Sequence, residues 1–151
     1  MKAFLSRYSF KIDRKGRVSV PAEYRQALAE LGSDGILAFP SLTERAIRCM
    51  TSALIEKITA EADPLSVFAA REPSLAQLSL SDIVRLAPDP EGRVVLPAEL
   101  IQHAGLTEVA LFAGQGTHFE IWDLVGWNEQ LERLRSGGNP TLPPGMENFS
   151  L

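Results

Sequence analysis

Residues 13–23 read DRKGRVSVPAE, and residues 89–99 read DPEGRVVLPAE. Asp, Gly, Arg, Val, Pro, Ala and Glu stand at the same places in both stretches, which begin 76 residues apart. An Asp at the first position and a Gly at the fourth suit a type I turn whose glycine takes a positive φ. Alternating apolar residues flank the turn on both sides, so each copy predicts a β-hairpin.

The same order of elements surrounds the two turns. A proline follows each returning strand and can occupy the first turn of a helix, where its missing N–H costs nothing. Gly32 and Gly105 then stop the two helices, and two strands and a closing helix follow. The predicted strands are 8–12, 17–20, 36–39, 46–50, 82–87, 93–96, 108–113 and 118–122, and the predicted helices are 22–31, 53–62, 98–104 and 124–135.

Two repeats are too few for a solenoid, which needs about three, so we expect them to pair with each other around one core. Residues 1–62 are the first repeat, with the basic hairpin, and residues 82–136 are the second. The offset falls from 76 to 72 residues along the repeats, which predicts a loop four residues longer in the first. Residues 63–81 are expected to form a partly helical linker, and 137–151 a Gly- and Pro-rich tail that is flexible or docked on a neighbouring chain.

Charge is distributed unevenly along the 151 residues. The formal net charge is −4, yet residues 1–25 hold seven basic and two acidic side chains, whereas residues 85–151 hold four basic and nine acidic ones. A basic arm on an acidic body is typical of a protein that contacts a polyanion, although a solvated face gives the same pattern. No apolar stretch is long enough for a membrane span or a signal peptide, so we expect a cytoplasmic protein without a membrane partner.

The two turns differ at their central positions. Arg14 and Lys15 stand there in the first copy, where side chains project into solvent, and Pro90 and Glu91 stand there in the second. Proline suits this position of the turn, and a glutamate repels phosphate. The repetition therefore preserves the turn while its positive tip belongs to the first copy alone.

The repeated motifs resemble the MraZ family of bacterial transcriptional regulators. The resemblance rests on D-x-x-x-R in both copies, each running into G-R-hydrophobic-x-hydrophobic-P, on FEIWD at 119–123, and on Trp127. It covers about residues 1–135. It implies a mainly β fold with short flanking helices, in which two tandem AbrB-like units form a pseudo-twofold, double-split (swapped-hairpin) β-barrel. It also implies ring-shaped homo-oligomers that bind short direct repeats in the promoter of the division and cell-wall operon, usually their own, and that associate with the nucleoid.

With this resemblance, the basic turn is interpreted as the DNA reader. Arg14 can donate two hydrogen bonds to a guanine edge, while lysines neutralise phosphates. The Asp and Arg of each turn suit a structural role, because the carboxylate can accept turn N–H groups and hold the arginine; for Arg17 direct phosphate contact is an equal alternative. The expected DNA-binding residues are Arg7, Lys11, Arg14, Lys15, Arg17 and Arg25, and the expected turn-building residues are Asp13, Gly16, Asp89, Gly92 and Arg93.

Two other classes of function compete with this interpretation. An enzyme has few candidate groups: His118 with Glu120 and Asp123 could form a metal or acid–base set, but Asp123 fits better as a helix cap, and no hydrolase, zinc or nucleotide motif occurs. We therefore expect no catalysis, metal, cofactor or small-molecule substrate. The single cysteine, Cys49, is expected to be a buried thiol. The remaining alternative is an antitoxin-like protein-interaction module without specific DNA readout.

Overall fold

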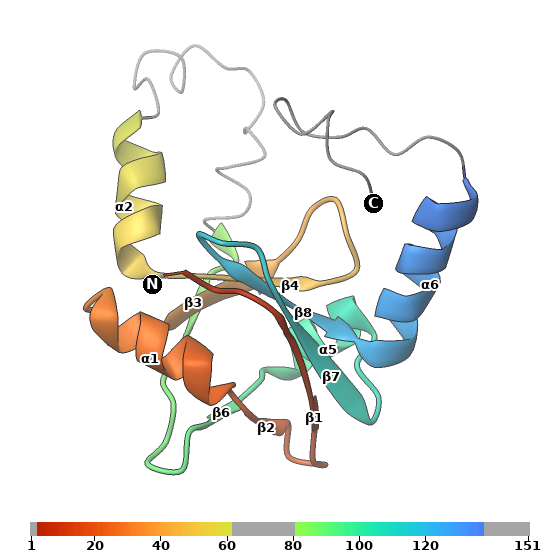
Figure 1. Cartoon of the computed structure of the whole chain (residues 1–151). Coiled ribbons are helices and arrows are strands. Elements are labelled where there is room, and N and C mark those ends of the chain that lie inside the picture. The colour runs from red at the N-terminus through yellow and green to blue at the C-terminus, as the bar shows by residue number, and fades with distance from the viewer. Residues whose placement is uncertain (1–2, 62–80, 138–151) are drawn as a thin grey trace.

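The structure is a computed structural model that describes residues 3–61 and 81–137 (Figure 1). The predictions for the linker and the tail fall on 62–80 and 138–151, outside the described residues. Each repeat contributes two strands, a helix, two strands and a helix, in that order. All the predicted strands and helices are confirmed, with boundaries within two residues of the expected ones. The first repeat holds β1 (Arg7–Lys11), β2 (Arg17–Ser19), α1 (Ala22–Glu30), β3 (Ile36–Pro40), β4 (Ile47–Met50) and α2 (Ser52–Glu61), and the second holds β5 (Val84–Leu86), β6 (Arg93–Val95), α5 (Ala98–Ala104), β7 (Val109–Gly114), β8 (Phe119–Asp123) and α6 (Leu124–Ser136).

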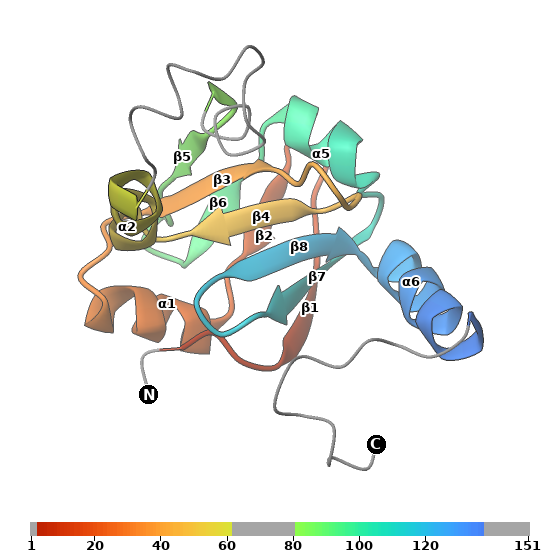
Figure 2. The same cartoon turned by 90° about the horizontal axis from the view of Figure 1, so that it is seen from above.

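The strands form one antiparallel sheet of six and a separate antiparallel pair, so the expected mainly β fold with short helices is confirmed (Figures 1 and 2). The order in the large sheet is β1-β7-β8-β4-β3-β5, and β2 pairs with β6. Replacing each strand by its equivalent in the other repeat gives the same order reversed. The two repeats are therefore related by a pseudo-twofold axis, and each lends its first strand to the third strand of the other.

Two details of the expected fold are wrong. The strands that flank each turn do not pair as a hairpin, because the backbone hydrogen bonds of β1 go to β7 and those of β2 go to β6. The strands of the described residues also do not close into one barrel. The six-stranded sheet ends at β1 and β5, since β2 and β6 are hydrogen-bonded as strands only to each other.

The expected loop difference is divided between two places. Leu37 pairs with Met50 as Leu111 pairs with Trp122, so β3 and β7 are offset by 74 residues, between the offset of 76 at the turns and that of 72 at β4 and β8. Two residues are added between the start of α1 and β3, where α1 has nine residues and α5 has seven, and two more in the connection from β3 to β4. The sequence alone gave only the sum of the two changes.

The main core is formed by the large sheet, the helices α1 and α5 and the β2–β6 pair, and both repeats contribute to it. Tyr24 of α1 packs on Phe119 of β8 with ring centroids 4.9 Å apart, and Phe4 lies 5.1 Å from the same ring. All three are almost completely buried. Cys49 is also fully buried, as expected, and burial raises the pKa of its thiol. A core shared in this way fixes the position of each turn relative to the other.

The predicted cap of the last helix is confirmed. Asp123 accepts a hydrogen bond from the backbone N–H of Gly126 at 3.2 Å at the start of α6. Thr51 caps α2 by accepting a hydrogen bond from the backbone N–H of Leu54 at 3.2 Å. Gly105 ends α5 in the left-handed conformation, with φ 62°. These groups satisfy helix-end donors and acceptors that would otherwise be unpaired.

Candidate nucleic-acid interface

The first turn, between β1 and β2, is closed by hydrogen bonds at its neck. The carbonyl oxygen of Asp13 accepts from Gly16 N at 3.0 Å, and Asp13 N donates to the carbonyl oxygen of Arg17 at 3.0 Å. Asp13 Oδ1 also accepts from the N–H groups of Lys15 at 2.9 Å and Arg17 at 2.8 Å. Gly16 supplies the positive φ of 81° that the turn needs. The side chains of Arg14 and Lys15 are consequently exposed at the tip.

The second turn has the same geometry with different residues at its tip. Gly92 N donates to the carbonyl oxygen of Asp89 at 2.9 Å, and the φ of Gly92 is also 81°. Asp89 Oδ1 accepts from the N–H groups of Glu91 and Arg93, each at 2.9 Å. The backbone therefore accommodates Pro90 and Glu91 without a change of turn type. What differs between the turns is the charge that they present.

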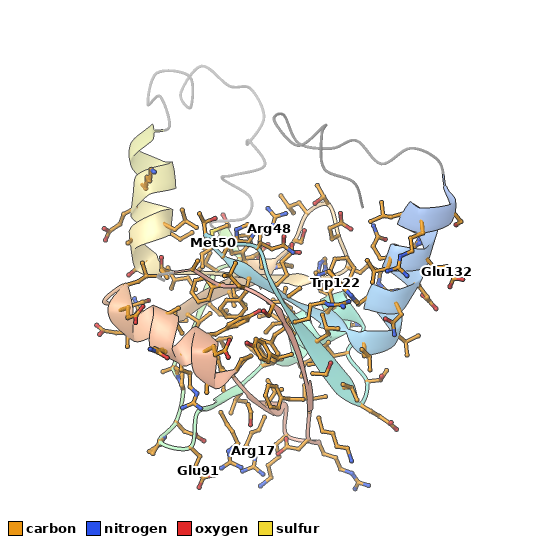
Figure 3. The ribbon with its side chains drawn as sticks, viewed as in Figure 1. Arg17, Arg48, Met50, Glu91, Trp122 and Glu132 are labelled. Carbon is orange, nitrogen blue, oxygen red and sulfur yellow. The ribbon has the colours of Figure 1, made fainter. Side chains whose placement is uncertain are left out.

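Each turn is held in place by the other repeat. The carbonyl oxygen of Gly16 accepts from Leu96 N at 2.8 Å, and that of Gly92 accepts from Val20 N at 2.9 Å. A Cβ added to Gly16 would lie 2.8 Å from the carbonyl oxygen of Leu96, which leaves no room for a side chain. Figure 3 shows Arg17 and Glu91 at the same end of the molecule, so both turns present their tips on one face.

The arginines at the necks of the turns differ in how fully they are neutralised. Arg17 Nε lies 2.7 Å from Asp13 Oδ2, which is its one ion pair among the described residues. Arg93 makes two: its Nε lies 3.4 Å from Asp89 Oδ2, and its Nη2 lies 2.8 Å from Glu91 Oε2. Each arginine side chain is more than a third exposed. Arg17 thus retains more of its positive charge for an external anion than Arg93 does.

The turn carboxylates are held in their charged form. The hydrogen bond from the backbone N–H of Arg17 is the largest influence on Asp13 and lowers the pKa of that carboxyl group, as do the Arg17 side chain and the N–H of Lys15. The hydrogen bond from the N–H of Arg93 does the same for the pKa of Asp89. Both carboxylates therefore remain ionised, and the necks remain closed, at neutral pH.

The other predicted DNA-binding residues lie in two places. Arg7 and Lys11 are on the exposed side of β1, which leads into the first turn. Arg25 is not beside them, because it donates from Nε to the carbonyl oxygen of Val20 at 3.2 Å and its guanidinium covers Gly92. Arg25 therefore flanks the second turn, a placement that spacing within one repeat could not show. At the positions equivalent to Arg7, Lys11, Arg14 and Lys15, the second repeat has Ile83, Ala87, Pro90 and Glu91.

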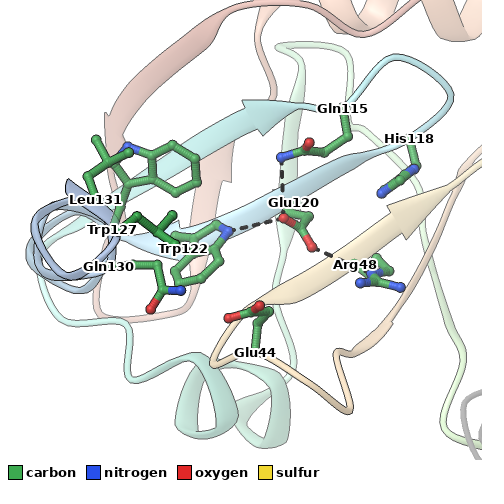
Figure 4. A pocket seen from close by; sticks show the side chains of 10 residues that line it. Glu44, Arg48, Gln115, His118, Glu120, Trp122, Trp127, Gln130 and Leu131 are labelled. Atoms are coloured by element: carbon green, nitrogen blue, oxygen red, sulfur yellow. Dashed lines mark hydrogen bonds and ion pairs between the residues drawn. The ribbon is translucent and has the colours of Figure 1, made fainter. Parts of the chain in front are cut away.

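The residues considered for catalysis are engaged in other contacts. Asp123 caps α6, and Glu120 forms an ion pair with Arg48 and accepts a hydrogen bond from Trp122 (Figure 4). His118 lines a cavity of about 280 Å³ together with Arg48, Glu120 and Trp122. Burial lowers the pKa of the His118 imidazole. In residues 3–61 and 81–137 there is no group of three or more His, Cys, Asp or Glu side chains that could hold a metal ion. Nor does that part of the chain contain a helix long and apolar enough to cross a membrane.

Taken together, these features define a class: a tandem-repeat, mainly β protein whose repeats exchange strands and carry matched Asp-x-x-Gly-Arg turns. A family model described as "MraZ protein, putative antitoxin-like" matches residues 80–140. A protein named Transcriptional regulator MraZ from Pelagibacter ubique is 42% identical over 136 residues, which is 90% of this chain and 88% of the relative. Proteins of the same name from Rickettsia canadensis and Rickettsia bellii are 38% identical over 131 and 132 residues, in each case 87% of this chain and 88% of the relative. The chain belongs to the MraZ family.

Proposed function

We propose that this protein is a sequence-specific, DNA-binding transcriptional regulator whose reader is the first turn. The observation that carries the proposal is the contrast between the two tips. Arg14 and Lys15 are exposed and have no hydrogen bond or ion pair from their side chains among the described residues, whereas the tip carboxylate Glu91 pairs with Arg93. The name that the curated relatives bear, Transcriptional regulator MraZ, supports the same function.

The turn suits DNA contact because its direction is fixed while its charges are free. The neck hydrogen bonds and the contact between Gly16 and Leu96 leave the tip little freedom to move, so a bound arginine loses little further entropy. Arg14 can reach a guanine edge with its guanidinium, and Lys15 and Lys11 can neutralise phosphates. Arg7 extends the line of cations along β1, Arg17 is available for phosphate contact, and Arg25 supports the face from the side of the second turn.

A single basic turn is a small contact, and its affinity for DNA should be low. Several turns on one ring-shaped homo-oligomer, facing short direct repeats in a promoter, raise the apparent affinity through effective concentration. We propose that the target is the promoter of the protein's own division and cell-wall operon. Such a protein would work in the cytoplasm, in association with the nucleoid, and would need no cofactor or small-molecule substrate.

Fluorescence anisotropy tests the proposal with DNA from upstream of the protein's own gene and with shuffled DNA as a control. We expect tight, sequence-dependent binding that weakens steeply with salt, by about 0.9 in log affinity per log salt for each phosphate neutralised. The double variant Arg14→Pro with Lys15→Glu should abolish binding and leave the circular dichroism spectrum unchanged, because the second turn accommodates those residues. The matched control, Pro90→Arg with Glu91→Lys, should matter far less.

An unchanged affinity after the exchange at the first turn would show that this turn is not the reader. Failure of the unaltered protein to bind either DNA at low salt would instead favour the second candidate function. That candidate is a protein-interaction module, and the words "antitoxin-like" in the description of the family model favour it.

A further inference from the structure

The pseudo-twofold axis passes between two charged residues in the middle of the large sheet. In the central strand pair, Arg48 of β4 lies directly opposite Glu120 of β8. The two residues are 72 apart, the offset that relates β4 to β8, so they occupy equivalent positions in the two repeats. On one side Ile47 pairs with Ile121, and on the other Cys49 pairs with Phe119. The axis therefore relates an arginine to a glutamate.

The glutamate depends on this arginine for its counter-charge. The side chain of Glu120 is 9% exposed, and its Oε2 lies 3.5 Å from Arg48 Nε. Its other oxygen, Oε1, accepts from Gln115 Nε2 at 3.4 Å and from Trp122 Nε1 at 3.3 Å, both in the second repeat (Figure 4). These two donors are uncharged, so they orient the carboxylate but do not neutralise its negative charge. Arg48 is its one cationic partner among the described residues.

Pairing of like repeats would bring like charges together. If β4 paired with β4 of a second copy about the same axis, two Arg48 side chains would face each other, and pairing of β8 with β8 would oppose two Glu120 carboxylates. Two Glu120 carboxylates would be strongly unfavourable because each is only 9% exposed and would lack a counter-charge, and two Arg48 side chains, each about a third exposed, would repel each other without a carboxylate between them. The flanking pairs are apolar in every combination, so they do not distinguish the alternatives. Neither does Val18 opposite Val94, the pair on the axis in β2 and β6, because both residues are the same.

We propose that Arg48 and Glu120 are the residues that determine which repeat pairs with which: the β4 surface fits the β8 surface and rejects a second β4. The partner that this surface selects is always the opposite repeat, either in the same chain or in a second copy of the chain. A single polar pair within an apolar interface is an established way to fix register and partner in coiled coils. This inference concerns assembly and does not depend on DNA binding.

Charge reversal in the full-length chain provides the first test. Arg48→Glu alone and Glu120→Arg alone each place like charges at the axis and should lower the melting temperature by about 5 to 10 °C. The double variant Arg48→Glu with Glu120→Arg restores opposite charges and should recover at least half of the larger loss. A double variant no more stable than the less stable single variant would overturn the proposal.

Mixing the two single variants tests the choice of partner directly. Neither variant contains opposite charges at the axis, but the first repeat of one variant complements the second repeat of the other. Equal amounts unfolded together in urea and refolded should therefore form a two-chain mixed complex, visible by native mass spectrometry, that melts above either variant refolded alone. A mixture that behaves as the sum of its components would contradict the proposal. If neither variant folds alone, any folded protein in the mixture must come from pairing between the two variants.

The control uses a pair of reversals far from the axis. Lys57 on α2 and Glu132 on α6 are exposed, and neither makes an ion pair among the described residues. Refolding Lys57→Glu together with Glu132→Arg should give no more mixed complex than the unaltered protein gives with a tagged copy of itself. Mixed complexes of equal abundance in this control would show that reversal of charge at the axis is not what selects the partner.

Discussion

Glu91 Oε2 lies 2.8 Å from Arg93 Nη2, and the first turn has no such ion pair because Lys15 stands at the equivalent position. One substitution between two turns of the same shape thus changes two charges: it removes a cation from the tip and neutralises the arginine at the neck. The turn shape can be kept across a duplication while the electrostatic potential of one copy is reversed.

Removing the Glu91 charge should make the second turn a partial contributor to DNA binding. Glu91→Gln keeps the turn and frees Arg93 from one of its two carboxylates, so we expect affinity for DNA to rise about threefold and the salt slope to steepen by about 1. Anisotropy titrations at several salt concentrations measure both. The control Glu132→Gln removes a charge from α6, away from the turns in Figure 3, and should leave the slope unchanged. A slope equally unchanged in Glu91→Gln would mean that the second turn does not face DNA.

The two turn glycines should differ in their tolerance of a side chain. Both have φ 81°, but a Cβ on Gly16 would meet the backbone oxygen of Leu96 at 2.8 Å, whereas on Gly92 it would meet the movable guanidinium of Arg25 at 2.7 Å. We expect Gly16→Ala to cost about 3 kcal/mol of unfolding free energy and Gly92→Ala about 1 kcal/mol.

Urea unfolding measures these two costs. Gly126→Ala in α6 serves as the control, because its Cβ would meet no atom closer than 3.7 Å and alanine favours a helix over glycine. It should be neutral or stabilising by up to about 1 kcal/mol. Equal losses at Gly16 and Gly92 would contradict the assignment of a rigid backbone contact to the first turn only.

Stability should fall in acid partly through the turn carboxylates. Hydrogen bonding to backbone N–H groups lowers the pKa of Asp13 and Asp89 in the folded protein below the ordinary value of 3.8. Their contribution to stability is therefore complete above pH 3.8 and is lost as the pH falls through the lowered folded-state pKa. Asp13→Asn should remove the contribution of Asp13 to the loss of stability in acid. The double variant with Asp89→Asn should remove the contributions of both carboxylates.

Urea midpoints measured from about pH 6 to about pH 2.5 give the pH dependence. The expected result is a shallower decline below pH 3.8 in Asp13→Asn than in the unaltered protein, and a still shallower one in the double variant. Superimposable acid limbs in all three proteins would exclude the turn carboxylates as a source of the acid sensitivity.

Local structure could be predicted well from the sequence because its signals are local. The positive φ of Gly16 and Gly92, the cap at Asp123 and the end of α5 at Gly105 each follow from the chemistry of one or two residues. The exposure of Arg14 and Lys15 follows in the same way from their central place in the turn.

The pairing of strands could not be predicted from the same signals. A repeated pattern indicates two similar units but does not say whether β1 pairs within its own repeat or with β7 of the other, since both possible partner strands carry apolar residues. The placement of Arg25 against Gly92 was missed for the same reason. Strand pairs between the repeats join residues 46 to 106 positions apart, from Ala38 with Val84 to Arg7 with Ala113, and their energy depends on which repeats meet, not on either segment alone.

The exchange of strands also affects how the chain acquires its shape during synthesis. β1 cannot form its strand pair until β7, which ends at Gly114, has been synthesised. At about 5 to 20 residues per second, the ribosome takes several seconds to make the intervening chain. Until then both edges of β1 lack a partner strand, whereas in the folded sheet only one does, and unpaired edges are surfaces on which chains aggregate. Arg7 and Lys11 lie on this strand, so the charges that are proposed to contact DNA in the folded protein would also repel other nascent chains.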